Sequence, residues 1–180
     1  MKKNNLSIFL SLILRHKPEE VGLTLDRFGW ANVDELIEKV SASGRTINRE
    51  ILEEIVITDD KNRYSFSDDK RKIRANQGHS VPVDVQLKKV VPPDKLYHGT
   101  ATKSLEGIKK NGIHSAKRLY VHLSRDIETA RIVGARHGRL VVLEINAKEM
   151  NNNGEEFFLS ENGVFLTKGV DYKYISDLIF

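Results

Sequence analysis

Residues 71–80 read RKIRANQGHS, an unusual stretch for the middle of a chain of 180 residues. Three of its first four residues are cationic, and Ile73 is its only side chain large enough to anchor a hydrophobic core. Small polar and turn-forming residues follow Arg74, so the stretch predicts a strand that runs into a hydrogen-bonding loop. Charge runs usually form a solvated face, but Arg74 is embedded in small polar residues. We therefore expect this stretch to present a guanidinium group to an anion.

The chain before and around this stretch is predicted to form three helices and a hairpin. The first helix stops at Lys17-Pro18 and has Arg15 and His16 in its last turn. The second begins at an N-cap pair, Asn32 and Glu35. The other predicted elements are an extended piece at 22–25, a helix at 49–56, a turn at 58–62 and paired strands at 63–67 and 72–76. Together they predict a winged-helix-like lobe.

Pro92-Pro93 is the best domain boundary, because neither proline can donate a hydrogen bond to a sheet. We predict lobes at 1–90 and 91–180, and the second lobe to be rich in strands with two helices. Its predicted elements are strands at 95–100, 118–124 and 139–145, a helix at 102–113 stopped by Asn111-Gly112, a helix to about residue 133 capped by Ser124, and a hairpin at 156–167. The predicted fold class is α+β.

The composition indicates an ordinary globular protein, with 39% hydrophobic and 30% charged residues. The net charge of +4 permits a polyanionic partner without demanding one. The chain has no cysteine, which excludes disulfides and thiol catalysis. No apolar run approaches the roughly 18 residues of a membrane helix, and the start of the chain is no convincing secretion signal, so we expect a cytoplasmic protein without membrane attachment.

The common nucleotide-binding signatures, the dinucleotide fingerprint and the P-loop, are missing. The histidines lack the short paired spacing of zinc sites, so no metal is expected. Other candidate residues also have ordinary structural explanations. Arg15, His16 and Arg136 lie near predicted helix ends, where cations complement the helix dipole. Gly99 suits a turn at a strand end, and His122 suits the inner face of a strand. Taken singly, none of these motifs identifies a function.

Taken together and in order, seven segments resemble the family of NAD-dependent RNA (tRNA) 2′-phosphotransferases. They are LRHKPEEVGL (14–23), RFGW (27–30), IRANQGHS (73–80), YHGT (97–100), VHLS (121–124), GARHG (134–138) and NGVFLT (162–167). The resemblance covers roughly residues 6–175, and IRANQGHS is its most specific motif. It implies an N-terminal winged-helix-like RNA-binding lobe and a C-terminal lobe of the ADP-ribosyltransferase type that binds NAD.

The resemblance also implies a reaction in two steps. An internal RNA 2′-phosphate, as in a tRNA splice junction, attacks the nicotinamide ribose and expels nicotinamide. A hydroxyl of that ribose then attacks the same phosphorus and releases 2′-OH RNA and ADP-ribose 1″,2″-cyclic phosphate. NAD is consumed, the RNA partner is tRNA-like, and no obligate protein partner is inferred.

The family's catalytic quartet matches Arg15, His16, Arg74 and Arg136, which are expected to meet around one phosphate. Guanidinium groups grip phosphate oxygens bidentately, and His16 is the member that can move a proton near neutral pH. If Arg15, His16 and Arg136 act mainly in the second step, their alanine variants should accumulate ADP-ribosylated RNA. The expected NAD-binding residues are His98, Gly99, Thr100, His122, Leu123, Ser124 and Val164, and Asn76, Gln77 and His79 are expected to bind substrate.

Val164 stands where relatives in the wider transferase fold often have a glutamate. A carboxylate there would repel a phosphate nucleophile by about 4 kcal/mol per charge pair at 4 Å and an effective dielectric of 20.

Two other functions remain open. One is a nucleic-acid-binding module without catalysis, and the other is an ADP-ribosyltransferase that modifies a phosphate and stops at the adduct.

Overall fold

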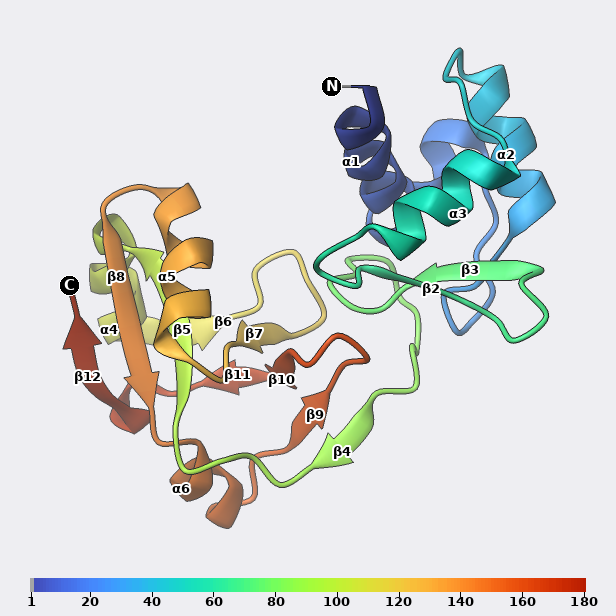
Figure 1. Ribbon diagram of the computed structural model, residues 1–180. Coiled ribbons are helices and arrows are strands. Elements are labelled where there is room, and N and C mark those ends of the chain that lie inside the picture. The colour runs from blue at the N-terminus through green and yellow to red at the C-terminus, as the bar shows by residue number, and fades with distance from the viewer. Residues whose placement is uncertain (1) are drawn as a thin grey trace. The chain divides into compact units, whose positions relative to one another are not determined.

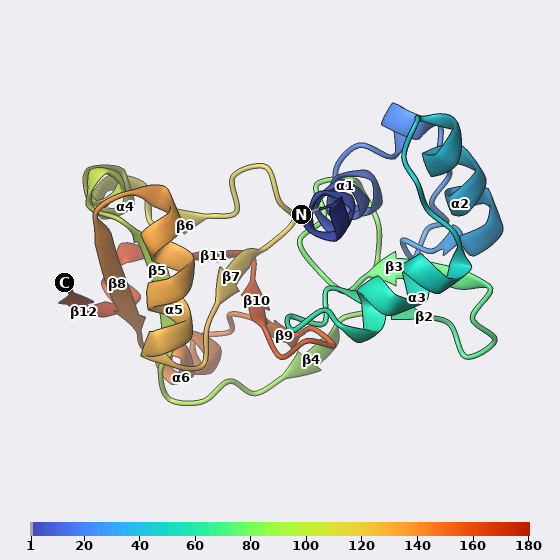
Figure 2. The same ribbon diagram turned by 45° about the horizontal axis from the view of Figure 1, so that its top comes forward.

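The computed structural model describes residues 2–180 (Figures 1 and 2). The chain divides into two compact units, Met1–Gln86 and Leu87–Phe180. We call them the N-terminal and the C-terminal unit. The sequence predicted the division at residue 90. It lies earlier because β4 (Lys88–Val90) pairs with β9 (Phe157–Leu159) and so belongs to the C-terminal unit.

The N-terminal unit consists of three α-helices and one antiparallel sheet in the order β1-β3-β2 (Figure 1). The predicted hairpin is confirmed, and the extended piece expected at 22–25 belongs to no sheet. Gly22 ends a 3-10 turn with a left-handed φ of 64°, a value that favours glycine. The elements are α1 Lys2–Arg15, η1 Pro18–Val21, β1 Ala31–Asn32, α2 Val33–Ala42, α3 Arg49–Ile57, β2 Tyr64–Phe66 and β3 Lys72–Ala75.

The core of the N-terminal unit lies between its helices and one face of β3. Ile73 and Ala75 of β3 are fully buried, together with Leu10, Ile13 and Leu14 of α1. Because successive side chains of a strand point to opposite faces, Arg74 lies on the face away from this core. The burial of its two neighbours therefore fixes the direction of the Arg74 side chain.

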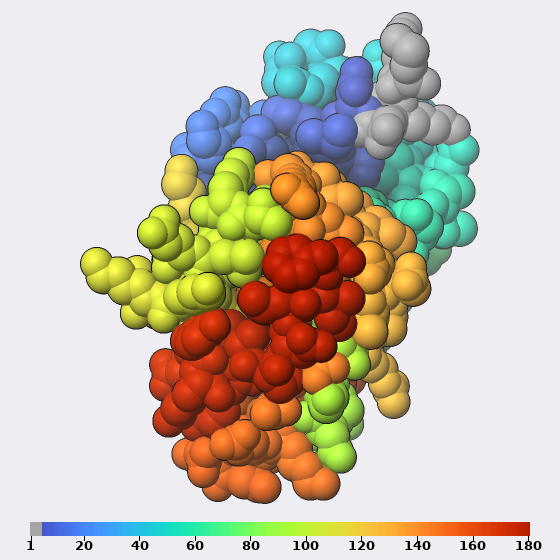
Figure 3. All heavy atoms as spheres, turned by 90° about the vertical axis from the view of Figure 1, so that its left-hand side faces the viewer, coloured from blue at the N-terminus to red at the C-terminus, as the bar shows by residue number. Residues whose placement is uncertain are grey.

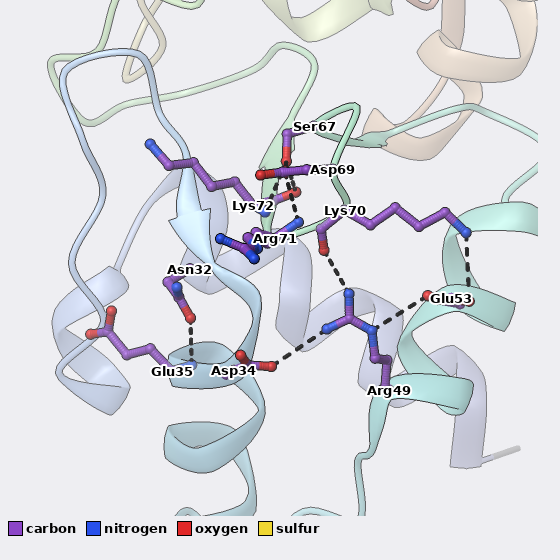
Figure 4. Close-up of polar contacts among 10 residues, drawn as sticks. All are labelled: Asn32, Asp34, Glu35, Arg49, Glu53, Ser67, Asp69, Lys70, Arg71 and Lys72. Atoms are coloured by element: carbon purple, nitrogen blue, oxygen red, sulfur yellow. Dashed lines mark hydrogen bonds and ion pairs between the residues drawn. The ribbon is translucent and has the colours of Figure 1, made fainter.

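The cationic residues before Arg74 belong to a separate polar network (Figure 4). The guanidinium of Arg49 donates to the backbone oxygen of Lys70 (2.8 Å) and approaches Asp34 of α2 (3.4 Å). Asp69 accepts a hydrogen bond from the backbone N–H of Arg71 (3.0 Å). The side chain of Lys72 pairs with Asp26 (3.0 Å). These contacts hold the β2–β3 turn against α2 and α3.

The helix cap predicted at Asn32 is confirmed. Its Oδ1 accepts a hydrogen bond from the backbone N–H of Glu35 at 3.0 Å (Figure 4), which satisfies one of the first N–H groups of α2. The side chain of Glu35 pairs with Lys39 instead of reaching back to the cap (2.9 Å).

The C-terminal unit consists of three short α-helices and nine strands, which form three sheets around a second core. Its sheets have the orders β4-β9-β10-β7, β12-β8-β5 and β11-β6. The hairpin predicted at 156–167 is confirmed as β9 and β10. The remaining elements are β5 Leu96–Ala101, η2 Thr102–Ser104, α4 Leu105–Asn111, β6 Ile113–His114, β7 Val121–Leu123, α5 Ile127–Gly134, η3 Ala135–His137, β8 Leu140–Ile145, α6 Ala147–Asn152, β10 Phe165–Thr167, β11 Gly169–Val170, η4 Tyr172–Tyr174 and β12 Ile175–Ile179.

Two predictions for this unit are wrong. Two helices were expected, but α6 is a third. Ser124 was expected to cap the helix after it, but the N-cap of α5 is Asp126, whose Oδ1 accepts a hydrogen bond from the backbone N–H of Thr129 (2.7 Å). Ser124 is instead bridged to Tyr97 by two backbone hydrogen bonds (2.8 and 2.9 Å). This bridge joins the edge of β5 to the chain just after β7.

Helix α5 packs directly on β5 and β8, as both ribbon views show (Figures 1 and 2). Two glycines allow the close approach. A Cβ at Gly99 would lie 1.7 Å from the carbonyl oxygen of Ala130, and one at Gly134 would lie 2.8 Å from the backbone of Gly99. Strand β12 forms the edge of the same sheet and lies at the surface (Figure 3).

The α+β class is confirmed, with six α-helices and several small sheets in the described part of the chain. The winged-helix-like and ADP-ribosyltransferase-like lobes stay predictions. Within residues 2–180, no helix combines the length and the apolar character that crossing a bilayer requires.

Candidate functional site

The end of α1 and the loop after β3 are joined by hydrogen bonds. The backbone N–H groups of Ser80 and Val81 donate to the carbonyl oxygen of Arg15, at 2.9 and 3.4 Å. They satisfy a carbonyl that the helix end leaves without an intrahelical partner. The side chain of Ser80 also contacts Nδ1 of His16 at 3.0 Å. Arg15, His16 and the end of the RKIRANQGHS stretch are therefore neighbours.

Gly78 brings this loop close to the guanidinium group of Arg15. Its φ of +88° lies in the left-handed region that favours glycine. A Cβ at this position would stand 3.7 Å from Nη1 of Arg15. The glycine in the motif thus serves a turn that passes directly beside a predicted catalytic side chain.

His79 lies close to Arg15, His16 and Arg74 in the N-terminal unit. Its side chain is buried, and its Nε2 has no hydrogen-bond partner among the described residues. Burial, together with the positive charges of Arg15, His16 and Arg74, lowers the pKa of His79 from 6.5 to about 4. The structure therefore brings three of the four predicted catalytic residues together around a neutral imidazole.

Arg74 stacks on the only tryptophan of the chain. Its guanidinium carbon lies 4.4 Å from the centre of the Trp30 ring. Trp30 and Ser80 both lie in the quoted motifs, but no role was predicted for either residue. The signal for Trp30 is the register of β1 and β3, which only the folded chain shows.

Asn76 and Gln77, which were predicted to bind substrate, lie in the loop after β3. Asn76 is buried, and its Nδ2 donates to the backbone oxygen of Asn62 at 2.7 Å, which ties the loop to the β2 side. Its Oδ1 is buried and has no hydrogen-bond partner among the described residues. Gln77 is half-buried beside it. Their predicted contact with substrate stays a prediction.

In the C-terminal unit, two predicted NAD-binding histidines are linked. Nδ1 of His98 lies 3.1 Å from the carbonyl oxygen of His122, and Nδ1 of His122 lies 3.1 Å from that of Tyr120. Burial lowers the pKa of His98, with a contribution from the nearby charge of His137, against the opposing effect of the hydrogen bond to His122. A carbonyl oxygen only accepts, so Nδ1 of a neutral His98 donates and its Nε2 is left as an acceptor. An acceptor of this kind suits a sugar hydroxyl.

Ser124 and Val164 lie next to this pair of histidines. Leu166 pairs with His122 and Phe165 with Leu123 across β10 and β7. Extending the register by one residue places Val164 opposite Ser124, on the same face of the sheet as Leu166. The turn before Val164 is held by Ser160, whose Oγ accepts a hydrogen bond from the N–H of Val164 (3.0 Å).

At three of the predicted NAD-binding positions, the packing of the C-terminal unit accounts for the residue type. Leu123 is buried in the core of the C-terminal unit, and Thr100 is buried in β5. Gly99 is required by the contact with Ala130 on α5. Any contact of Leu123 or Gly99 with NAD would therefore involve backbone groups.

Arg136 lies in the C-terminal unit on the 3-10 turn η3, which continues α5, and its side chain is exposed. Its neighbour His137 is also exposed, and its charge acts on His98. The meeting of Arg136 with the three cationic residues of the N-terminal unit stays a prediction. Among the described residues, no three His, Cys, Asp or Glu side chains gather closely enough to hold a metal ion.

The low pKa of His79 predicts acid sensitivity of the N-terminal unit. His79 binds a proton more weakly in the folded state than in the unfolded state. The stability that depends on its neutral form is therefore complete above about pH 6.5 and is lost as the pH falls toward 4. Lowering the pH from 7 to 5 is expected to reduce the free energy of unfolding by about 2 kcal/mol. Urea unfolding followed by the emission of Trp30, which reports on this unit alone, measures the change.

A His79→Gln variant should lose most of this pH dependence, whatever its absolute stability. A His114→Gln variant, changed at an exposed histidine of the C-terminal unit, should keep it. The same loss between pH 7 and 5 in wild type and His79→Gln would show that another group is responsible.

Comparison with known proteins identifies relatives along almost the whole chain. The model of the family described as "RNA 2′-phosphotransferase, Tpt1 / KptA family" matches residues 1–169. A probable RNA 2′-phosphotransferase of Fusobacterium nucleatum is 58% identical over 171 residues, covering 94% of this chain and 96% of that protein. Proteins with the same name are 47% identical in Hahella chejuensis (97% of this chain, 94% of that protein) and 49% identical in Escherichia coli K12 (94% and 92%). With motifs, fold class and near full-length matches in agreement, the chain belongs to the RNA 2′-phosphotransferase family of the Tpt1/KptA type.

Proposed function

We propose that this protein is an enzyme that transfers an internal 2′-phosphate of RNA to NAD. The products are 2′-OH RNA, nicotinamide and ADP-ribose 1″,2″-cyclic phosphate. Family membership and the names of the relatives support the phosphotransferase activity. The observation that carries the proposal is the gathering of Arg15, His16 and Arg74 around His79. Ser80 contacts His16 and the turn at Gly78 passes beside Arg15, while the charge of Arg74 acts on His79.

In the first step, an oxygen of the RNA 2′-phosphate forms a bond to C1 of the nicotinamide ribose. The carbon–nitrogen bond to nicotinamide breaks, and nicotinamide leaves with the electron pair. The nucleophile is already an anion and needs no base. Val164, on the sheet face next to His122, offers no carboxylate that would repel this phosphate.

In the second step, the 2″-hydroxyl of the same ribose attacks phosphorus, and the RNA 2′-oxygen leaves. The hydroxyl loses a proton and the departing oxygen gains one. His16 is the group proposed to move a proton, and Ser80 holds its ring through Nδ1. Arg15, Arg74 and Arg136 are proposed to stabilise the negative charge that builds up on the phosphoryl oxygens.

The C-terminal unit is proposed to bind NAD as the second substrate. His98 and His122 are oriented by carbonyl oxygens, which leaves the Nε2 of a neutral His98 as an acceptor for a ribose hydroxyl. The backbone bridge between Tyr97 and Ser124 fixes the strand ends on which both histidines stand. The hydrogen-bonding groups of these two histidines are therefore suited to a nucleotide sugar.

The test uses an oligoribonucleotide with one internal 2′-phosphate and a matched oligonucleotide with a 2′-hydroxyl. With NAD, the phosphorylated RNA should release one nicotinamide for each phosphate lost, and mass spectrometry should show 2′-OH RNA and the cyclic phosphate product. The matched oligonucleotide should release none. An RNA-binding protein without catalysis would give no nicotinamide, and an ADP-ribosyltransferase would stop at the RNA adduct.

A further inference from the structure

Trp30 and Arg74 are cross-strand neighbours in the N-terminal unit. Ala31 pairs with Ile73 in the antiparallel register of β1 and β3. Extending this register by one residue places Trp30 opposite Arg74, where side chains of an antiparallel pair meet. The guanidinium carbon lies 4.4 Å from the ring centre, within the range of a cation–π contact.

The turn before β1 holds Trp30 in place. Oδ1 of Asp26 accepts hydrogen bonds from the backbone N–H groups of Trp30 (3.0 Å) and Phe28 (2.9 Å). The N–H of Asp26 donates in turn to the carbonyl oxygen of Trp30 (2.9 Å). Oδ2 of Asp26 pairs with Lys72 on β3 (3.0 Å). The backbone of Trp30 is thus anchored to the same strand that bears Arg74.

An aromatic ring orients a guanidinium group in a way that a carboxylate cannot. Stacking covers one flat side of the guanidinium and leaves the N–H groups in its plane able to donate to phosphate oxygens. The ring carries no net charge, so it does not neutralise the cation and does not repel a phosphate. A carboxylate partner would do both.

We propose that Trp30 is a positioning residue, whose ring holds the guanidinium of Arg74 in the orientation that receives the RNA 2′-phosphate. This inference rests on the proposed function. Trp30 acts through Arg74 and not on the reacting atoms. The effect of changing Trp30 should therefore depend on the presence of Arg74.

The first experiment measures binding without NAD. The affinity for the 2′-phosphorylated oligonucleotide is determined by fluorescence anisotropy of a labelled RNA, for wild type, Trp30→Leu, Arg74→Leu and the double variant. Trp30→Leu should weaken binding about 10-fold. In the Arg74→Leu background the same change should have less than about a twofold effect, as a double-mutant cycle requires for coupled residues. Equal effects in both backgrounds would overturn the proposal.

The matched control is Phe28 in the same turn. The guanidinium carbon of Arg27 lies 4.5 Å from the centre of the Phe28 ring, so Phe28→Leu removes a similar cation–π contact that does not involve Arg74. This variant should bind and react within about twofold of wild type, while Trp30→Phe, which keeps an aromatic face, should recover most of the loss. An equal loss in Phe28→Leu and Trp30→Leu would point to a general effect on the turn and contradict a positioning role.

A second readout uses the emission of Trp30 itself, since the chain has no other tryptophan. Titrating wild type with the 2′-phosphorylated oligonucleotide should change the emission, and the 2′-OH oligonucleotide should change it far less. A different result would contradict the proposed function: wild type would bind the phosphorylated RNA but release no nicotinamide when NAD is added. The positioning role fails if transfer occurs but the cycle shows no coupling.

Discussion

Replacing Arg74 by leucine is expected to lower the rate of phosphate transfer about 10³-fold in single-turnover reactions with a 2′-phosphorylated RNA and NAD. A preorganised donor aimed at developing charge contributes 10²–10³-fold in other enzymes, and arginines at phosphoryl groups contribute more, roughly 10³–10⁵-fold. Arg74 lies opposite the core face of β3 and close to His79, so its loss would remove one of the guanidinium groups that lie around this imidazole. Arg74→Lys should recover a minor part of the rate, because lysine keeps the charge and loses the planar fork.

The control for Arg74 is Arg71, three residues earlier on the same hairpin. Its side chain is exposed, and its backbone N–H contacts Asp69 (Figure 4). Arg71→Leu should react within about threefold of wild type, as surface changes usually do. Mass spectrometry of the RNA separates the two steps, since unreacted RNA and ADP-ribosylated RNA differ in mass. A rate for Arg74→Leu close to that of Arg71→Leu would contradict a catalytic role.

The second large effect is expected at Gly99. A methyl group there would stand 1.7 Å from the carbonyl oxygen of Ala130 and 2.8 Å from the backbone nitrogen of Gly134. Backbone atoms cannot move aside as a flexible side chain does, so α5 would have to leave β5. Gly99→Ala should destabilise the C-terminal unit by about 4 kcal/mol or more, at the upper end of single substitutions. Urea unfolding followed by circular dichroism measures the loss, while the emission of Trp30 shows whether the N-terminal unit stays folded.

Gly107→Ala is the matched control. Gly107 lies within α4, and a Cβ there would meet no atom within 4 Å. Alanine is favoured over glycine inside a helix by about 0.5–1 kcal/mol, so this variant should be as stable as wild type or more stable. Similar unfolding of Gly99→Ala and Gly107→Ala would show that α5 and β5 can separate at little cost.

Much of the fold could be predicted because helices and hairpins leave local signals. The cap at Asn32, the stop at Gly112 and the hairpin around Gly163 depend on neighbours in the sequence. Helix α6 was not predicted although Asn146 and Glu149 have the spacing of a cap pair, because the helix is short and buries only Ala147 and Met150. The two-residue strands β6 and β11 exist only through their pairing with each other. Such elements are set by long-range contacts.

The cap of α5 shows how tertiary contacts choose between equivalent local signals. Ser124 and Asp126 are both favourable N-cap residues. The backbone of Ser124 is committed to its bridge with Tyr97, so the chain stays extended there and the helix begins only after Asp126. The sequence could not reveal this, because the bridge joins segments far apart in the chain.

For the candidate site, the residue types were predictable and their partners were not. The motif RKIRANQGHS indicated that Arg74 differs from Arg71 and Lys72, and alternation along β3 explains why. The stacking of Trp30 on Arg74 depends on a strand register that a single sequence does not contain. The neutral state of His79 likewise depends on its burial among cations from two segments of the chain.

The pairing of β4 with β9 determines where the C-terminal unit begins when it is produced as a separate fragment. A fragment that starts at Leu87 keeps β4 and with it the hydrogen bonds along one side of β9. A fragment that starts after Pro93 leaves that side of β9 without a partner strand. The edge of the sheet then passes from β4, which carries Lys88 and Lys89, to the apolar residues of β9. Lysines on an edge strand discourage pairing with another chain, so the shorter fragment is more exposed to self-association than the longer one.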